Sequence, residues 1–142
     1  MFTDGQINSI RDVVQKVLKK HTQLIPDTIR ERLWTKGTYS DGTPIVTYKA
    51  QPPFRYAPFT VAIKKSKGQP TDRVTLRDSG AFYQSIRVVA GSDSLTIEGD
   101  TDKFSDNLDT DGILELSDED IEKIIPQILE DVQKEIKEAL VL

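Results

Sequence analysis

Apolar residues recur at intervals of three and four over residues 7–24, with lysine and arginine on the other faces. This spacing predicts an amphipathic helix near the N-terminus, capped by Thr3 or Asp4. A shorter helix is predicted over Pro26–Trp34, because proline suits a first helical position. Gly37 follows as a helix stop. We therefore expect two consecutive helices at the start of the chain.

The C-terminal segment carries a second long apolar stripe, which runs from Ile121 to Leu140 at helical spacing. Ser117 with Asp120 forms an N-cap signature before it, and the acidic first turn suits the positive end of a helix dipole. Pro126 interrupts the pattern, so the helix is expected either to kink there or to begin later.

Between these helices the chain is predicted to form strands, turns and a loop. Asp41-Gly42 predicts a tight turn, and Gly91–Ser94 predicts a hairpin turn. Gln51–Pro58 contains three prolines and cannot join a central β-ladder, so an extended arm or a disordered loop is expected there. Strands are predicted at residues 45–48, 59–63, 74–76, 86–89 and 95–98.

These elements predict an α+β fold in which the N- and C-terminal amphipathic helices pack on one face of an antiparallel sheet. The length of 142 residues suits a single domain, 1–142. We expect helices at about 4–35, strands, arm and a short motif helix at about 38–99, and an acidic turn and C-terminal helix at about 100–142. No apolar run approaches the roughly 20 residues that cross a bilayer, and no signal-peptide pattern is seen, so no membrane partner is expected.

Charge is distributed unevenly along the chain, although the net charge is only -4. Residues 1–71 hold 12 Lys+Arg against 5 Asp+Glu, a charge of +7, and residues 72–142 hold 7 against 18, a charge of -11. Such asymmetry is typical of a subunit with complementary interaction surfaces. The alternative, equally open from the sequence, is that the basic and acidic helices neutralise each other within the monomer.

The sequence offers little for catalysis or for a cofactor. It has no cysteine, and its one histidine, His21, lies near the end of a predicted helix, where the helix dipole favours it. No second group accompanies this histidine at a usable spacing, and a lone histidine makes a poor metal site. We therefore expect no enzyme, no cofactor and no catalytic residue; a small hydrolase is the least favoured class.

An acidic segment around Gly112 has the spacing of a calcium-binding loop. With Gly112 at the sixth position, Asn107, Asp109 and Asp111 fall at positions one, three and five, the Ile113 carbonyl at seven, and Asp118 at twelve. Asn at the first position and the shorter Asp at the twelfth weaken the match. A solvated acidic turn is favoured, and a calcium-binding or generic protein-interaction module is kept as the alternative function.

Two predicted loops, around residues 54–56 and 64–67, together carry basic and aromatic side chains. Such side chains can bind along the phosphate backbone of a nucleic acid. The isoelectric point of about 5.0 argues against general DNA binding, and surface solvation is the commoner explanation of such loops. The candidate interaction residues in these loops are Phe54, Arg55, Tyr56, Lys64, Lys65 and Lys67.

Residues 74–86 carry the most distinctive local pattern, in which a strand enters L-x-D-[ST]-G-x-[FL]-x-x-S-[IF] and a second strand follows. Asp78 or Ser79 can cap a short helix, and Gly80 allows the tight turn into it. Phe82 and Ile86 share the face of this helix that is directed to the core. The motif contains no catalytic group. Its residues are Leu76, Asp78, Ser79, Gly80, Phe82, Ser85 and Ile86.

The segment 73–120 is similar to the core of tailed-bacteriophage neck and tail-completion (head–tail connector) proteins, in the version found in phages of Bacteroidetes-type hosts. The resemblance implies a structural virion protein at the head–tail joint, assembled in the host cytoplasm as a homo-oligomeric ring. Its implied partners are portal, connector or tail proteins, with a passing contact to packaged DNA. A ring requires unlike faces to meet, which the uneven charge suits. The arm at Gln51–Pro58 could reach a neighbour.

Overall fold

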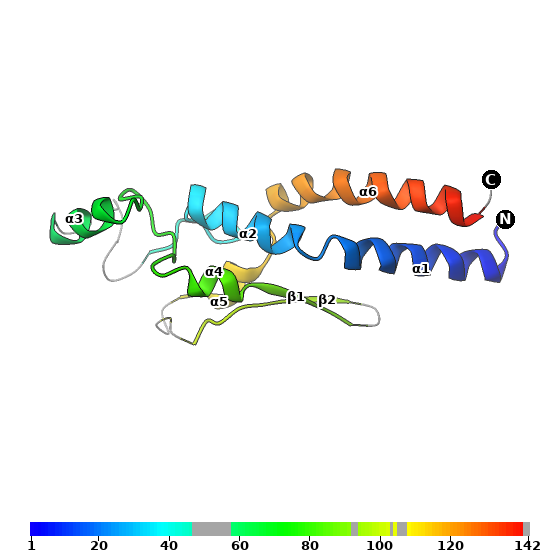
Figure 1. Cartoon of the computed structure of the whole chain (residues 1–142), viewed down its shortest axis with the longest axis horizontal. Coiled ribbons are helices and arrows are strands. Elements are labelled where there is room, and N and C mark those ends of the chain that lie inside the picture. The colour runs from blue at the N-terminus through cyan, green and yellow to red at the C-terminus, as the bar shows by residue number, and fades with distance from the viewer. Residues whose placement is uncertain (47–57, 92–93, 103, 105–107, 141–142) are drawn as a thin grey trace.

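The computed structural model describes residues 1–46, 58–91, 94–102, 104 and 108–140. Figure 1 shows an elongated molecule in which the two longest helices lie side by side and both termini lie at the same end. A β-hairpin runs along one side of the helices, and one short helix lies at the far end. The α+β class with terminal helices and an antiparallel sheet is confirmed. In chain order the elements are α1 (Asp4–Lys20), α2 (Leu24–Thr35), α3 (Pro58–Ser66), α4 (Ala81–Ser85), β1 (Arg87–Ala90), β2 (Leu95–Glu98), α5 (Thr110–Leu114) and α6 (Asp118–Leu140).

Local hydrogen bonds explain where the N-terminal helices start and stop. Thr3 caps α1 through a reciprocal pair: its Oγ1 accepts from the Gln6 amide at 3.1 Å, and the Gln6 side chain accepts from the Thr3 amide at 2.9 Å. After α2, Gly37 takes the left-handed conformation with a φ of 61°, and its amide donates to the carbonyls of Arg32 and Leu33. The predicted cap and the predicted stop are both confirmed.

Helix α6 begins with the predicted capping pair and continues through its proline. The Asp120 amide donates to Ser117 Oγ at 3.0 Å, and the Ser117 amide donates to Asp120 Oδ2 at 3.0 Å. Pro126 lies inside the helix on an exposed side, so α6 does not begin later. Helix α6 packs antiparallel to α1 along most of its length (Figure 1).

The β-hairpin matches the two strands expected around residues 86–89 and 95–98. Strands β1 and β2 pair antiparallel, with Arg87 opposite Glu98 and Ala90 opposite Leu95. The Gly91 amide donates to the Ser94 carbonyl at 2.7 Å, which closes the hairpin at the predicted turn. Residues 92 and 93 of that turn lie outside the described part of the chain.

Two other predicted strands are wrong. Residues 59–63 belong to helix α3, because the segment follows Pro58, which suits a first helical turn, and no strand of the described chain pairs with it. Residues 74–76 are irregular and join no ladder, although Val74 and Thr75 are buried, and Leu76 has a positive φ. Of the strand expected at 45–48, residues 45 and 46 are irregular and the rest lie outside the described residues, as does Gln51–Ala57 of the predicted arm.

The predicted Asp-Gly turn is confirmed. Gly42 has a φ of 87°, and the Tyr39 amide donates to the Thr43 carbonyl at 2.9 Å. Asp41 accepts hydrogen bonds from the Thr43 hydroxyl at 2.6 Å and the Thr43 amide at 2.9 Å, and these bonds lower the pKa of its carboxyl group. An isolated bridge between Thr38 and Pro44 closes the turn.

The hydrophobic core sits where α2, α4, α5 and the start of α6 meet, at the inner end of the hairpin. Helix α1 contributes Val13 and Val17, which are buried against α6. Helix α3 contributes no buried residue. The core therefore occupies the middle of the molecule. Its fully buried side chains include Ile29, Leu33, Ile45, Phe82 and Ile113.

Candidate interaction surfaces

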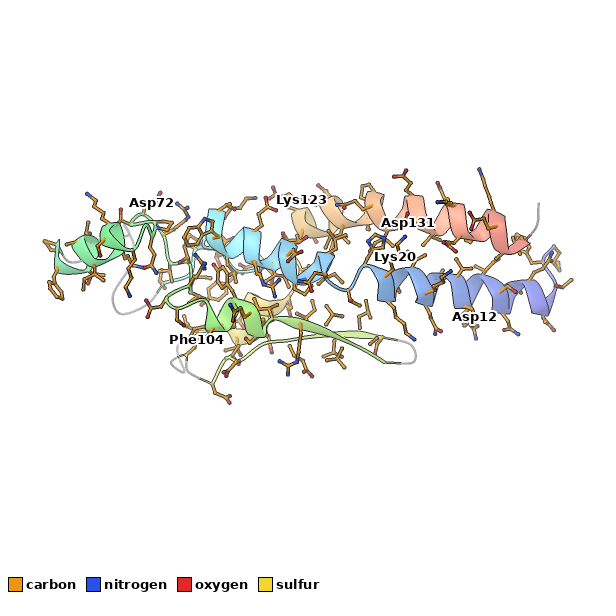
Figure 2. The ribbon with its side chains drawn as sticks, viewed as in Figure 1. Asp12, Lys20, Asp72, Phe104, Lys123 and Asp131 are labelled. Atoms are coloured by element: carbon orange, nitrogen blue, oxygen red, sulfur yellow. The ribbon has the colours of Figure 1, made fainter. Side chains whose placement is uncertain are left out.

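Ion pairs join α1 to α6 along their antiparallel seam. Lys16 Nζ lies 3.2 Å from Glu135 Oε2, and His21 Nε2 lies 2.6 Å from Asp131 Oδ2. Lys20 Nζ approaches the same Asp131 oxygen at 3.4 Å, and Figure 2 shows these two side chains between the two helices. Hydrogen bonds from His21 and then from Lys20 lower the pKa of Asp131. The one histidine of the chain thus links two helices.

A buried ion pair holds α2 to the first turn of α6. The side chains of Arg32 and Asp120 are 3% and 4% exposed and are hydrogen-bonded to each other. The Arg32 guanidinium also donates to the carbonyls of Ile113 at 2.6 Å, Glu115 at 2.8 Å and Thr38 at 3.2 Å. These bonds offset the cost of removing two charges from water. Nothing in the sequence pattern had distinguished Arg32 from the surface cations.

These contacts bear on the uneven charge of the chain. Lys16 and Lys20 of the basic half pair with acids of α6, as does buried Arg32. Lys36 joins them, with its Nζ 2.5 Å from Glu119 Oε2, and this contact lowers the pKa of Glu119. Part of the asymmetry therefore cancels inside the monomer. The basic and acidic halves of the sequence thus meet where α1 and α2 pack against α6.

The predicted basic and aromatic interaction residues lie only in part within the described chain. Lys64 and Lys65 lie in the last turn of α3, at the end of the molecule far from both termini (Figure 1). Lys67 follows, and its ammonium lies 2.8 Å from Asp78 Oδ1, a contact that lowers the pKa of Asp78. Phe59 on the same helix is 77% exposed. Outside the described residues lie Phe54, Arg55 and Tyr56.

The motif at residues 74–86 enters a tight corner through two residues with positive φ. Leu76 has a φ of 59°, a rare conformation for a residue with a side chain, and Gly80 has a φ of 90° as the N-cap of α4. Ser79 Oγ accepts from the Ala81 amide at 3.3 Å. Asp78 does not cap the helix, since its carboxylate is paired with Lys67.

The C-terminal part of the motif, residues 82–86, is largely buried, and hydrogen bonds fix its position. Phe82 and Ile86 are 1% and 2% exposed, as the shared helical face predicted. Ser85 Oγ donates to the Phe82 carbonyl at 2.6 Å and accepts from the Asp100 amide at 2.9 Å, which ties the corner to the chain after β2. The rings of Phe82 and Phe104 meet edge to face with centroids 4.7 Å apart.

An arginine that the sequence did not single out clamps the same corner. Arg30 donates from Nε to the Tyr83 carbonyl at 2.7 Å and from Nη2 to the Ile86 carbonyl at 2.9 Å. The Tyr83 hydroxyl donates to the Thr75 carbonyl at 2.5 Å. Burial raises the pKa of Tyr83 well above its usual range. The motif therefore acts as a rigid junction between α2 and the hairpin.

Within the described residues, the acidic segment does not assemble the calcium loop that was kept as the alternative. Asp109 Oδ1 accepts from the Gly112 amide at 3.1 Å and so caps α5. The Ile113 carbonyl, expected to face the ion, accepts instead from the cationic guanidinium of Arg32. Asn107 lies outside the described residues, and among those described no three acidic or histidine side chains are grouped to hold a metal.

An apolar groove of about 560 Å³ lies between α1 and the tip of the hairpin. It occupies the side of α1 away from α6, since Figure 1 shows α6 along one side of α1 and the hairpin along the other. Arg11 and Lys19, one at each end of the α1 part of the groove, are exposed. Its lining includes Arg11, Val14, Gln15, Leu18, Lys19 and Leu95.

Helix α6 leaves one apolar row in solvent. Ile121, Ile125 and Leu129 are 37%, 51% and 49% exposed, and they follow one another at intervals of four residues. Glu122 and Glu130 are exposed, and each stands one position after an end of this row. The sequence pattern predicted one apolar stripe along this helix that includes Ile121 and Ile125, but in the structure the buried apolar residue is Ile124, on the side that packs against α1 and α2.

No family model, curated protein or solved structure matches the chain. Within the described residues no helix is both long and apolar enough to cross a bilayer. The surfaces themselves therefore carry the functional argument.

Proposed function

We propose that this chain is a non-enzymatic structural protein of a tailed-phage virion, which packs against copies of itself and against portal, connector or tail proteins at the head–tail joint. The phage assignment rests on the resemblance of residues 73–120 to neck and tail-completion proteins. The assembly role rests on surface chemistry, which is independent of that resemblance.

The single observation that carries the assembly role is the exposed apolar row of α6. Three large aliphatic side chains in one row expose between a third and a half of their area, although α6 already has a packed side. A contiguous apolar patch on a folded protein typically marks an interaction site. The far end of the molecule adds a second patch, since Phe59 and Ile63 of α3 are 77% and 39% exposed.

The polar clusters support a structural role for the chain. His21 and Asp131 could form the base and orienting acid of a catalytic triad, but no hydroxyl group of the described residues is hydrogen-bonded to the ring. The carboxylate is shared with Lys20, which favours an ion-pair role between helices. Arg32 and Asp120 are buried and saturated with hydrogen bonds, so they are suited to rigidity.

Particles of the phage that encodes the chain provide the test. Gradient-purified virions, probed with an antibody against the chain, are expected to contain it, and gold labelling is expected at the junction of head and tail. Deletion of the gene is expected to leave filled heads and separate tails. Infectious particles of normal shape that lack the chain would overturn the proposal.

A further inference from the structure

The groove surface of α1, whose apolar residues are half-buried, and the exposed surface of α6 have matching patterns. On α1, the groove residues Val14 and Leu18 are flanked by the row Arg11, Gln15 and Lys19. This row has a positive charge at each end and an uncharged residue in the middle. The two charges are eight residues apart, which is about 12 Å along a helix.

The exposed surface of α6 has the same layout with the opposite sign. The apolar row Ile121, Ile125 and Leu129 is followed, one position later, by Glu122, Pro126 and Glu130. The two glutamates are also eight residues apart, again about 12 Å along the helix. The spacing of charges and the position of the apolar row therefore agree between the two surfaces.

We infer that the exposed face of α6 docks in the α1–hairpin groove of a second copy of this chain. The inference deepens the self-assembly part of the proposed function, on which it rests. When the two helices run antiparallel, the row on α1 of one copy faces the row on α6 of the next. These rows are Arg11, Gln15 and Lys19 on α1, and Glu122, Pro126 and Glu130 on α6. Lys19 of one copy then lies against Glu122 of the next, and Arg11 lies against Glu130.

Within the described part of the chain, the charges that make this contact are not paired. Among the described residues, no carboxylate lies within ion-pair distance of Arg11 or Lys19, and no cation lies within that distance of Glu122 or Glu130. Lys16 and Lys20, by contrast, face α6 of their own chain. The intramolecular ion pairs therefore leave this second, complementary set available.

The geometry makes the contact head-to-tail. The groove lies on the side of α1 opposite α6, so a subunit that receives a neighbour in its groove still presents its own α6 row. Such a heterologous contact repeats from copy to copy, and it closes a ring if the rotation between copies allows closure. The apolar side chains supply the burial, and the flanking charges set direction and register.

Exchange of charges between two variants tests the contact. Lys19→Glu brings two carboxylates together where position 19 meets Glu122, and Glu122→Lys brings two ammonium groups together where position 122 meets Lys19. Each variant alone is therefore expected to self-associate at least about tenfold more weakly than the unaltered chain in sedimentation velocity. An equimolar mixture restores an opposite-charge contact in both directions and is expected to recover association. Lys134→Glu, an equivalent reversal at an exposed site of α6 away from the apolar row, is the control and is expected to associate normally.

Circular dichroism of each variant verifies that it is folded. The inference is overturned if the unaltered chain stays monomeric at the highest soluble concentration. It is also overturned if the single variants self-associate as strongly as the unaltered chain, or if the mixture associates as weakly as each variant alone. These measurements use the purified chain alone. A chain that is absent from virions yet passes the exchange test overturns the proposed function only, and a virion protein that fails the exchange test overturns this contact only.

Discussion

His21 Nε2 lies 2.6 Å from Asp131 Oδ2, and this contact joins residues 110 positions apart in the sequence. The same carboxylate oxygen is 3.4 Å from Lys20, so one acid of α6 meets two side chains at the end of α1. The seam between the terminal helices is therefore stabilised by charged contacts as well as by the buried side chains of Val13 and Val17.

Replacement of Asp131 by Asn is expected to change the acid stability of the chain. Because the pKa of Asp131 is lowered in the folded state, its contribution to stability is present above its ordinary pKa of 3.8 and is lost as the pH falls through the lower folded-state value. Asp131→Asn is expected to lower Tm at pH 7 by about 2 °C and to have no such effect below the folded-state pKa. Thermal unfolding followed by circular dichroism measures both. Glu138→Gln, at an exposed position of the same helix, is the control, and an equal effect from it would contradict the assignment.

Replacement of Asp120 by Asn is expected to be far more costly. The variant keeps the shape of the side chain but leaves the buried Arg32 guanidinium without its counter-charge, which is expected to lower the free energy of unfolding by about 3–5 kcal/mol. Urea denaturation measures the loss. Asp118→Asn, at an exposed position in the same turn, is expected to cost under about 0.5 kcal/mol. Similar midpoints for the two variants would show that the buried pair is not the dominant contact.

Alanine substitutions at two glycines separate backbone strain from steric overlap. Both Gly37 and Gly42 have positive φ, but a Cβ at Gly37 would lie 2.6 Å from the Val74 carbonyl oxygen, whereas a Cβ at Gly42 meets nothing within 4 Å. Gly42→Ala is expected to cost about 1 kcal/mol and Gly37→Ala about 3 kcal/mol. Equilibrium denaturation in guanidinium gives both values. Equal costs would mean that the backbone at Gly37 and Val74 can move apart to accept the added Cβ.

Removal of the Tyr83 hydroxyl tests the corner formed by residues 74–86. Tyr83→Phe leaves the Thr75 carbonyl without its hydrogen bond, at an expected cost of about 1–3 kcal/mol. Burial raises the pKa of Tyr83 in the folded state, so its contribution is complete below its ordinary pKa of 10.0 and is lost as the pH rises towards the folded-state value. The unaltered chain is therefore expected to lose stability above about pH 10, and the variant is expected to lose less.

Denaturation series at about pH 8 and about pH 10.5, on either side of the ordinary tyrosine pKa, measure this difference. Tyr39→Phe is the control, since Tyr39 packs against the same core and is half-buried. A variant with the same alkaline loss as the unaltered chain would show that the Tyr83 phenol is not the group that titrates.

Features that depend on neighbouring residues in the chain were predictable. The Thr3 and Ser117 caps, the Asp41-Gly42 turn and the stop at Gly37 follow from side-chain and backbone preferences within a few residues. The hairpin was predictable for the same reason, since its two strands are joined by a short turn. Residues 59–63 were misassigned because β-branched residues favour a strand, whereas a strand needs a partner that no local pattern reveals.

The amino-acid sequence alone determined the amphipathic terminal helices, their caps and the central turns, because each of these depends on side chains only a few positions apart. It also determined the total charge, which is a sum over the chain. Tertiary structure alone decided which charges cancel and which remain for a partner. It paired Asp131 with His21 and Lys20, buried Arg32 with Asp120, and left Lys19 and Glu122 exposed. The reason is physical: an ion pair depends on distance in space, and packing of α6 against α1 sets distances that positions in the chain do not contain.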